Sequence, residues 1–310
     1  MRLIIDTDTA GDDCVSMLIA LRSPGVTVEA ITINCGNVDF DQQVENALYT
    51  LEAAGVGGAI PVYPGARQPL LHPHQTVEHI HGRDGMGDSF FPRATQRPAD
   101  EHAVDALIRL INAHPGAFTI VAQAPLTNLA LAVRQDPSIA HKVEHLWIMG
   151  GTNNALGNVT PAAEFNVYVD PEAAKIVFGA GFPLTMVGWE ICLRHAVLDD
   201  AAWRDIEALG TPLARFFMDV NRVARRFDIE NSVTAGSTHP DAIVAAMAID
   251  PSIMTSSGDY YVDVETRGEF TRGATVVDLL GVLGRPPNAR VCLAADGARF
   301  RARLMDVLRG

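Results

Sequence analysis

Short apolar runs alternate with longer amphipathic segments along most of the chain. The apolar runs are rich in β-branched residues and too short to be helices, which is typical of buried strands. We expect strands at residues 3–5, 26–33, 61–63, 118–122, 143–149 and 183–187. We expect helices at residues 14–21, 40–54, 101–113, 126–134, 173–178, 201–209, 212–226, 242–249 and 301–308. This alternation predicts an α/β fold with a mostly parallel open sheet flanked by helices.

The C-terminal part of the chain has a different pattern. Residues 260–266 and 274–279 alternate apolar and polar positions, as antiparallel strands do. We therefore add a small antiparallel region to the predicted fold. The sequence has no clear linker, and 310 residues are enough for one large core, so we expect a single domain over residues 1–310.

Composition and charge exclude several classes of protein. No stretch approaches the ~18 apolar residues of a membrane span, and the net charge of −13 argues against nucleic-acid or anionic-membrane partners. Met1 and Arg2 lead directly into the first strand, so we expect no signal peptide. The four cysteines are scattered without a CxxC pair. We therefore expect reduced thiols and a cytoplasmic location.

Four carboxylates lie within eight residues after the first strand. Asp6 and Asp8 share one face of the strand, and Asp12 and Asp13 open the next helix. An N-cap explains one acid at a helix start but not the whole set. Clustered carboxylates repel unless they share a proton or a cation. Because no His or Cys lies among them, the stretch favours a hard cation such as Ca²⁺ or Mg²⁺.

Polar residues also follow the later strands, at the edge of a parallel sheet where ligands bind. Asn37 follows the second strand and Gln123 the fourth, and either one alone is also typical of an ordinary turn. A loop after the fifth strand carries Asn158, Glu164 and Asn166. Its many donors and acceptors suit a polyol such as a sugar, or they satisfy the loop's own backbone.

Residues 65–99 form a long loop rich in Pro and Gly, with four histidines. Long loops of this kind are often lids, so we interpret residues 81–87 as a flap that closes over a ligand. A zinc site is the alternative, although the spacing fits no common pattern. Arg222, Arg225 and Arg226 lie near one face of a later helix, which is either a solvated face or an anion clamp.

Taken together, these segments resemble the inosine–uridine nucleoside hydrolase family. Five separated blocks carry the resemblance in the family's order and approximate spacing: Asp6-Thr-Asp8 with Asp12-Asp13, Gly36-Asn37-Val38, Pro125-Leu-Thr-Asn128, Gly157-Asn158 with Glu164-Phe-Asn166 and Asp170-Pro-Glu-Ala-Ala174, and Asp241 before an apolar helix that ends at Ile249-Asp250-Pro251. They span residues 1–251.

The resemblance implies a Rossmann-like fold and a Ca²⁺-dependent hydrolase that splits ribonucleosides into ribose and free base. It implies metal ligands at Asp8, Asp13, Asp241 and the backbone carbonyl of Gln123. The residues it places on the ribose are Asp12, Asn37, Met149, Asn158, Glu164, Phe165 and Asn166, and it places His81 in the flap near the base. Asp8 is our candidate general base for the attacking water. The resemblance also implies a homo-oligomer, either a dimer or a tetramer.

The sequence departs from the family pattern in two places. The family's usual turn is Asp-Pro-Gly-x-Asp-Asp, and here it is Asp8-Thr9-Ala10-Gly11-Asp12-Asp13 with the same spacing. The second departure concerns the leaving group. Many relatives carry a His directly before the last metal acid, but here Pro240 holds that position and His239 lies one residue earlier. Pro240 fixes its own φ and restricts His239. The general acid is therefore His239 or another residue such as His81, or else the leaving base is activated by stacking. Trp189 is either a stacking partner or a structural Trp.

The departures leave base preference open between purine, pyrimidine and modified bases. They also leave two alternatives to a ribonucleoside hydrolase of the usual kind. One is a metal-dependent ribose- or nucleoside-binding protein with little turnover, and the other is a hydrolase for a non-standard ribosyl substrate. A third alternative, a phosphotransferase with Asp6 or Asp8 as nucleophile, would need basic residues near the acids, and the strand-end loops carry few.

Overall fold

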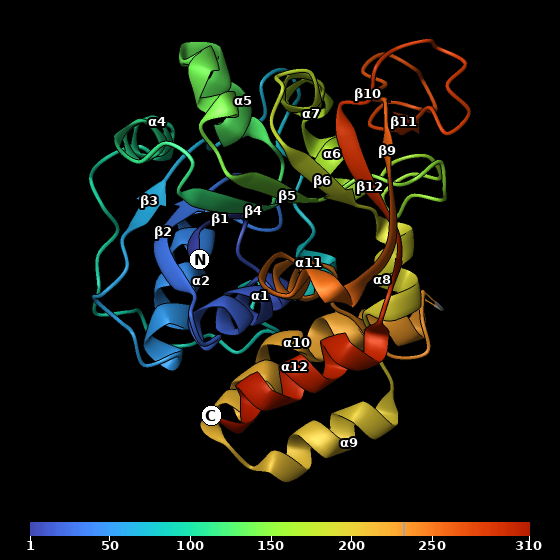
Figure 1. Cartoon of the computed structure of the whole chain (residues 1–310). Coiled ribbons are helices and arrows are strands. Elements are labelled where there is room, and N and C mark those ends of the chain that lie inside the picture. Colours follow the sequence, from blue (N-terminus) through green and yellow to red (C-terminus); the bar gives the residue numbers. More distant parts are fainter. Residues whose placement is uncertain (232) are drawn as a thin grey trace.

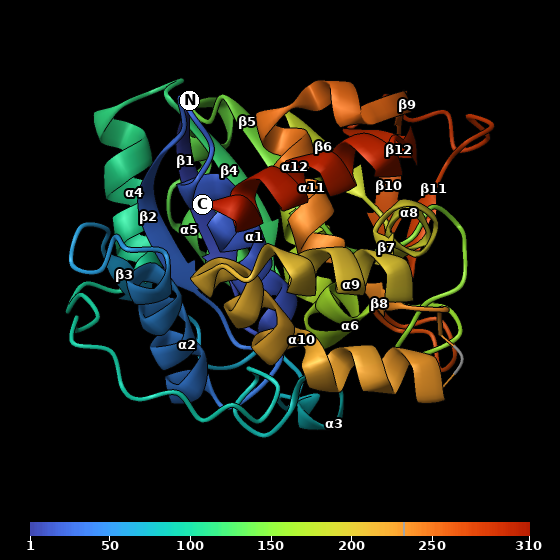
Figure 2. The same ribbon diagram turned by 90° about the horizontal axis from the view of Figure 1, so that it is seen from below.

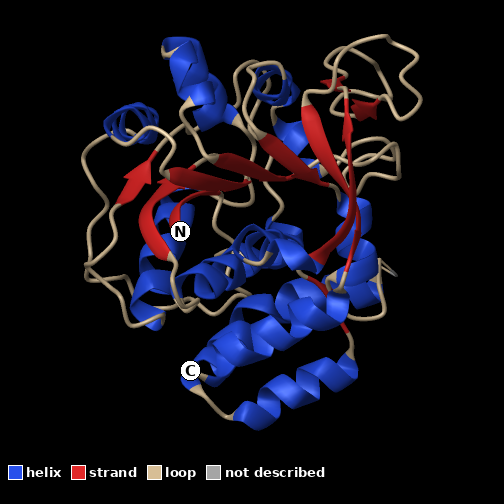
Figure 3. Cartoon of the chain, viewed as in Figure 1, coloured by secondary structure: helices blue, strands red, loops and turns tan. Residues whose placement is uncertain are grey.

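The chain forms a single eight-stranded sheet with helices on both faces (Figures 1 and 3). A computed structural model describes residues 1–231 and 233–310. Its helices are α1 Gly11–Leu21, α2 Phe40–Ala53, α3 Glu78–His81, α4 Ala103–Ala113, α5 Thr127–Gln135, α6 Phe165–Val169, α7 Pro171–Phe178, α8 Trp189–His195, α9 Asp200–Leu209, α10 Pro212–Glu230, α11 Pro240–Ile249 and α12 Gly297–Arg309, with 3₁₀ turns at Pro137–His141 and Pro251–Ile253.

The strand order places the N-terminal strand inside the sheet. The strands are β1 Arg2–Thr7, β2 Thr27–Ile33, β3 Val62–Pro64, β4 Phe118–Gln123, β5 His145–Met149, β6 Leu184–Val187, β7 Val197–Leu198, β8 Ser237–Thr238, β9 Met254–Tyr260, β10 Val262–Val264, β11 Thr275–Val277 and β12 Ala289–Ala295. The sheet runs β3-β2-β1-β4-β5-β6-β12-β9, and every pairing is parallel except that of β12 with β9. The predicted fold class is confirmed.

Two hydrophobic cores lie on the two faces of the sheet, because alternate strand residues point to opposite sides. Ile5 belongs to the core that includes residues of α1, α2, α10, α11 and α12, whereas Ile4 belongs to the core that includes residues of α4, α5 and α7. Both side chains are fully buried, which explains the continuous apolar run of β1. Seen from below, α9, α10 and α12 form an outer layer beyond α1 and α11 (Figure 2).

The predicted antiparallel C-terminal region is present as the pair β10 and β11. The sequence did not reveal β9 and β12, which extend the main sheet by two strands. No helix within residues 1–231 and 233–310 is long and apolar enough to cross a membrane. All four cysteines are free and buried, as expected.

Candidate active site

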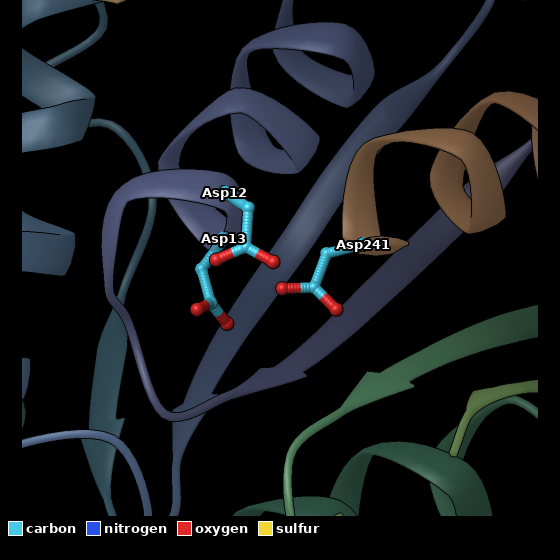
Figure 4. A group of neighbouring side chains, drawn as sticks. All are labelled: Asp12, Asp13 and Asp241. Atoms are coloured by element: carbon cyan, nitrogen blue, oxygen red, sulfur yellow. The ribbon is translucent and has the colours of Figure 1, made fainter. Parts of the chain in front are cut away.

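Three buried aspartates meet at the carboxyl edge of the sheet. Asp12 and Asp13 project from the first turn of α1, and Asp241 projects from the first turn of α11. In Figure 4 the carboxylates of Asp12 and Asp241 point toward each other. One carboxylate oxygen from each of the three lies within 4.8 Å of the others. Within the described residues this is the one group of three or more His, Cys, Asp and Glu side chains close enough to share a metal ion, and it contains no flap histidine.

This group differs at two acids from the metal ligands that the resemblance implies. It contains Asp12, which we expected on the ribose, and it does not contain Asp8. Asp8 is nevertheless close, because the charges of Asp13 and Asp12 both act on it. Its Oδ2 accepts a hydrogen bond from the Asn37 backbone amide at 3.0 Å. A Cβ on Gly36 would lie 1.7 Å from that same oxygen, so only glycine lets the Asp8 carboxylate occupy this place.

Asp13 is fixed by four donors. Its Oδ1 accepts from the Thr7 hydroxyl at 2.5 Å and from Gln123 Nε2 at 3.0 Å. Its Oδ2 accepts from the Ala10 amide at 2.9 Å and from Asn37 Nδ2 at 3.2 Å. The Gln123 side chain therefore orients an acid of the cluster. This is a role beyond the backbone carbonyl that the resemblance implies.

Burial and mutual repulsion shift the pKa values of these acids upward. Burial is the main cause at every member, because the charged form loses its hydration. It raises the pKa of Asp13 to about 6, with a further contribution from Asp12. It raises the pKa values of Asp8 and Asp241 well above the ordinary range, and the neighbouring carboxylates add to both. The pKa of Asp12 is raised for the same reason.

The donor set fits a hard divalent cation. Every candidate ligand is an oxygen, which suits Ca²⁺ or Mg²⁺ rather than zinc. Within the described residues, Oδ1 of Asp8 and Oδ1 of Asp12 are buried without a hydrogen-bond partner. A buried polar atom without a partner is destabilising, so these oxygens favour a ligand that supplies positive charge.

The polar loop after β5 brings its expected residues together around Glu164. Glu164 Oε2 accepts from the Gly151 amide at 2.8 Å, and Oε1 accepts from the Asn166 amide at 2.9 Å. Burial raises its pKa to about 7. Asn166 Nδ2 donates to the Met149 carbonyl at 3.2 Å, which ties this loop to the end of β5.

Asn158 and Phe165 support the start of α6. Asn158 Oδ1 accepts from the Phe165 amide at 2.9 Å, and Asn158 itself is exposed. Phe165 packs with Val77 and Val169, so it joins α6 to the segment that leads into α3. Asn158 therefore has a structural contact in addition to any contact with a sugar.

His81 ends the one-turn helix α3 and lies beside the acids. Its Nδ1 is 3.9 Å from Asp12 Oδ1 and has no hydrogen-bond partner among the described residues. Burial is the main reason that its pKa is lowered to about 4, which keeps the ring neutral at pH 7. The structure thus brings the flap and the acidic cluster together.

His239 is fully buried, and its described side-chain contacts are with Ser237 and Phe217. Its Nε2 is 2.7 Å from the Ser237 hydroxyl, and its ring centroid is 5.1 Å from that of Phe217. Burial lowers its pKa to about 3. Its Nδ1 has no partner among the described residues.

Trp189 lies at the start of α8. It is 8% exposed and packs in the core that Ile5 joins, and its amide donates to the Gly151 carbonyl at 2.9 Å. The backbone bond braces the loop after β5, and stacking of the Trp189 ring on the base stays a prediction.

Asp6 has a structural role. Its Oδ1 accepts from Thr32 Oγ1 at 2.6 Å and from Asn128 Nδ2 at 2.8 Å, on the α5 side of the sheet. Burial raises its pKa to about 6. These bonds tie β1 to β2 and to α5 through Oδ1, whereas Oδ2 of Asp6 is buried without a partner among the described residues.

Sequence reasoning missed the residues that hold the flap. Asn46 of α2, Asp84 of the flap and Arg222 of α10 bond to the flap backbone. The sequence signal for this role is Asp84, which lies between Gly82 and Gly85, because an Asp in a tight turn often accepts hydrogen bonds from backbone amides. Arg225 donates to Asp200, so the predicted arginine face divides between a flap contact and an ion pair.

Comparison with known proteins gives one consistent result. The sequence model of the inosine-uridine preferring nucleoside hydrolases matches residues 3–302. The pyrimidine-specific ribonucleoside hydrolase RihB of Escherichia coli O9:H4 (strain HS) is 33% identical over 309 residues, which cover 100% of this chain and 97% of RihB.

Solved structures agree with this result over the full length. The plant nucleoside hydrolase PpNRh1 superposes with a TM-score of 0.94 at 33% identity, covering 100% of this chain and 99% of the plant chain. The purine-preferring ribonucleoside hydrolase from Gardnerella vaginalis superposes with a TM-score of 0.93 at 29% identity, covering 100% and 98%.

Proposed function

Because the chain belongs to the inosine-uridine preferring nucleoside hydrolase family, we propose that it hydrolyses the N-glycosidic bond of ribonucleosides to ribose and free base. The buried cluster of Asp12, Asp13 and Asp241 carries this proposal. It lies at the carboxyl edge of a parallel sheet, where ligands bind in this type of fold. A buried, oxygen-only cluster next to an amide-rich loop suits a sugar substrate held beside a cation.

We assign the cluster to Ca²⁺. Asp12, Asp13 and Asp241 would hold it together with Asp8 and the Gln123 carbonyl, since hard oxygen ligands in this number are those that Ca²⁺ takes. When bound, the cation neutralises the negative charge of these buried carboxylates, and its positive charge polarises hydroxyls and water. Asp8 keeps one buried oxygen without a protein partner, which is the atom that we propose as acceptor of the proton from the attacking water.

The ribose would lie against the loop after β5. Glycosidic cleavage develops oxocarbenium-like charge on the sugar, and hydrogen bonds to its hydroxyls strengthen in that transition state. Asn37, Asn158, Glu164 and Asn166 offer the acceptors and donors for these bonds. Met149 and Phe165 line the same region with apolar surface, since Asn166 bonds to one and directly follows the other.

We assign the leaving-group proton to His81 in preference to His239. The His81 ring lies 3.9 Å from Asp12, whereas His239 contacts Ser237 and Phe217. General acid catalysis needs a ring that carries the proton before the bond breaks. Burial lowers the pKa of His81 to about 4, and the Asp13 carboxylate opposes that shift, so the position of the ring and not its pKa supports this assignment. His239 stays the alternative, because its Nδ1 also has no partner among the described residues.

The test is release of reducing sugar from a panel of purine and pyrimidine ribonucleosides, with and without EDTA. Release that EDTA abolishes and that is lost in Asp8→Ala supports the proposal. The relatives differ in base preference, so the panel also determines that of this chain. If p-nitrophenyl riboside alone is cleaved, the substrate is a non-standard riboside. If Ca²⁺ and ribose bind but nothing is cleaved, the protein is a binding protein.

We also expect a homo-oligomer, either a dimer or a tetramer, and light scattering on the purified protein measures it directly.

A further inference from the structure

The second half of the flap is held by a small set of polar bonds in addition to the packing of Met86, which is 3% exposed and belongs to the core that Ile5 joins. The Asp84 carboxylate, which is 4% exposed, accepts from the backbone amides of Met86 at 2.8 Å, Asp88 at 2.9 Å and Phe90 at 2.6 Å. One buried side chain thus shapes the whole turn from residue 84 to residue 90.

Asn46 joins this turn to the acidic turn. Its side chain is 1% exposed, and its Nδ2 donates both to the Asp84 carbonyl at 2.8 Å and to the Thr9 carbonyl at 3.0 Å. Gln42 Nε2 donates to its Oδ1 at 2.8 Å, which fixes the amide orientation. A single side chain therefore bridges the flap and the segment that leads into Asp12 and Asp13.

Arg222 fastens the other side of the same turn. Its Nε donates to the Gly87 carbonyl, and its guanidinium NH₂ donates to the Asp88 carbonyl. Gly87 has φ +70°, and a Cβ there would lie 2.2 Å from the Asp219 carbonyl of α10. The flap backbone is therefore pressed directly against α10 at the place that Arg222 holds.

The turn of residues 84–90 also fixes the position of His81. The Gly87 amide donates to the His81 carbonyl at 2.9 Å, so the residue that Arg222 holds is bonded directly to His81. The chain of contacts runs from α10 through Arg222 and Gly87 to His81, whose ring lies beside Asp12.

We propose that Arg222 and Asn46 are positioning residues that dock the flap and hold His81 beside Asp12 for the protonation of the leaving base. Arg222 acts on the flap alone, whereas Asn46 acts on both the flap and the acidic turn. The inference rests on the proposed hydrolase function and adds to it a specific role for one arginine of the α10 face.

The test compares Arg222→Met with Arg226→Met, a matched control on the same helix. Arg226 is exposed and makes no hydrogen bond or ion pair within the described residues. We expect Arg222→Met to reduce kcat on natural ribonucleosides by about 10- to 100-fold, since small misplacements of a catalytic group have effects of this size. Cleavage of p-nitrophenyl riboside, which needs no leaving-group acid, should stay within about twofold. The control should match the wild type on both substrates.

A double-mutant cycle shows whether the arginine acts through His81. In a His81→Ala background, Arg222→Met should cause no further loss on natural nucleosides, because the group that it positions is absent. At saturating Ca²⁺, Asn46→Ala should reproduce the substrate-selective loss. In a separate titration it should also weaken Ca²⁺ binding, whereas Arg222→Met should leave Ca²⁺ binding unchanged.

Equal losses on both substrates, or an undiminished effect of Arg222→Met in the His81→Ala background, would overturn the proposal. Hydrogen exchange gives a readout that is independent of turnover. The amides of residues 86–90 should exchange faster in Arg222→Met than in Arg226→Met. If the wild type releases no ribose from any substrate, the proposed function fails, and unchanged exchange in Arg222→Met would separately overturn the anchoring role.

Discussion

Replacing Asp241 with asparagine is expected to change stability in opposite directions with and without a divalent cation. Asp241 shares its buried site with Asp12 and Asp13, each with an oxygen within 4.8 Å. Two charges at that distance repel by about 3 kcal/mol at an effective dielectric constant of about 20. Without metal, a fully ionised Asp241 would therefore oppose folding through two such pairs.

Protonation relieves part of this repulsion and sets the pH at which it appears. Burial raises the pKa of Asp241 well above the usual range, so the native state binds the proton more tightly than the unfolded chain does. Relative to asparagine, which does not titrate, the metal-free wild type loses stability as pH rises from the unfolded-chain pKa of about 4 towards the raised native pKa, because only the native state must keep the proton. Below about pH 4, Asp241→Asn should be neutral. Well above that pH, it should stabilise the metal-free protein by about 2 kcal/mol, or about 5 °C in Tm.

With Ca²⁺ present the same substitution should be harmful. A ligand that binds only the native state raises stability by about 2.7 kcal/mol at 100 times its Kd. Loss of one carboxylate from the cluster should abolish most of that increase. The assay is thermal unfolding at pH 6 to 9, in EDTA and in Ca²⁺, with Asp250→Asn as control. Asp250 lies at the other end of α11 and caps the next turn through Ser252, so its replacement should only destabilise slightly.

Two results would refute this reasoning. If Asp241→Asn keeps the full Ca²⁺-induced rise in Tm, Asp241 is not a ligand. If the metal-free variant gains no stability over the wild type between pH 6 and pH 9, the three carboxylates do not repel as their placement requires.

Three further substitutions test the rest of the site. Gly36→Ala should reduce activity by at least about 100-fold, because the new Cβ would lie 1.7 Å from Asp8 Oδ2. Gly179→Ala is the control and should have little effect, since the atom nearest to its new Cβ would lie 3.3 Å away. The kcat on one nucleoside measures both effects. Glu164→Gln should lose more activity above pH 7 than below it, because burial raises the pKa of Glu164 to about 7 and the protonated acid resembles glutamine; the ratio of kcat/KM values from pH 6 to 8 measures this. His81→Ala should lower hydrolysis of natural nucleosides by about 10²- to 10³-fold and spare p-nitrophenyl riboside; equal losses would remove His81 as the acid.

The regular part of the fold could be predicted because local pattern determines it. Each parallel strand from β1 to β6 is a short apolar run, and the helices between them are amphipathic. The edge strand β9 was not predicted, because Met254–Tyr260 is largely polar and partly exposed. β12 reaches the sheet by pairing with β6, far earlier in the chain, and such pairing leaves no local signal.

The acidic cluster could be anticipated in part for the same reason. The ends of parallel strands meet at one edge, so the acids after β1 were expected near the residues after β2 and β4. The structure confirms this proximity through the bonds of Asn37 to Asp8 and of Gln123 to Asp13. Which oxygens face one another depends on side-chain rotamers, and these brought Asp12 rather than Asp8 into the group with Asp241.

The position of His239 shows where backbone reasoning stops. Pro240 begins α11, and His239 precedes it with φ −127° and ψ 71°, outside the α region that a following proline disfavours. That restriction places the Cβ, but the ring direction is decided by Ser237 and Phe217, which come from two other elements. His81 is likewise placed by bonds from α2 and α10 to the flap, not by its own segment. The identity of the proton donor in this chain is therefore a property of tertiary contacts, and substitution of the contacts is a sharper test of it than substitution of the histidines alone.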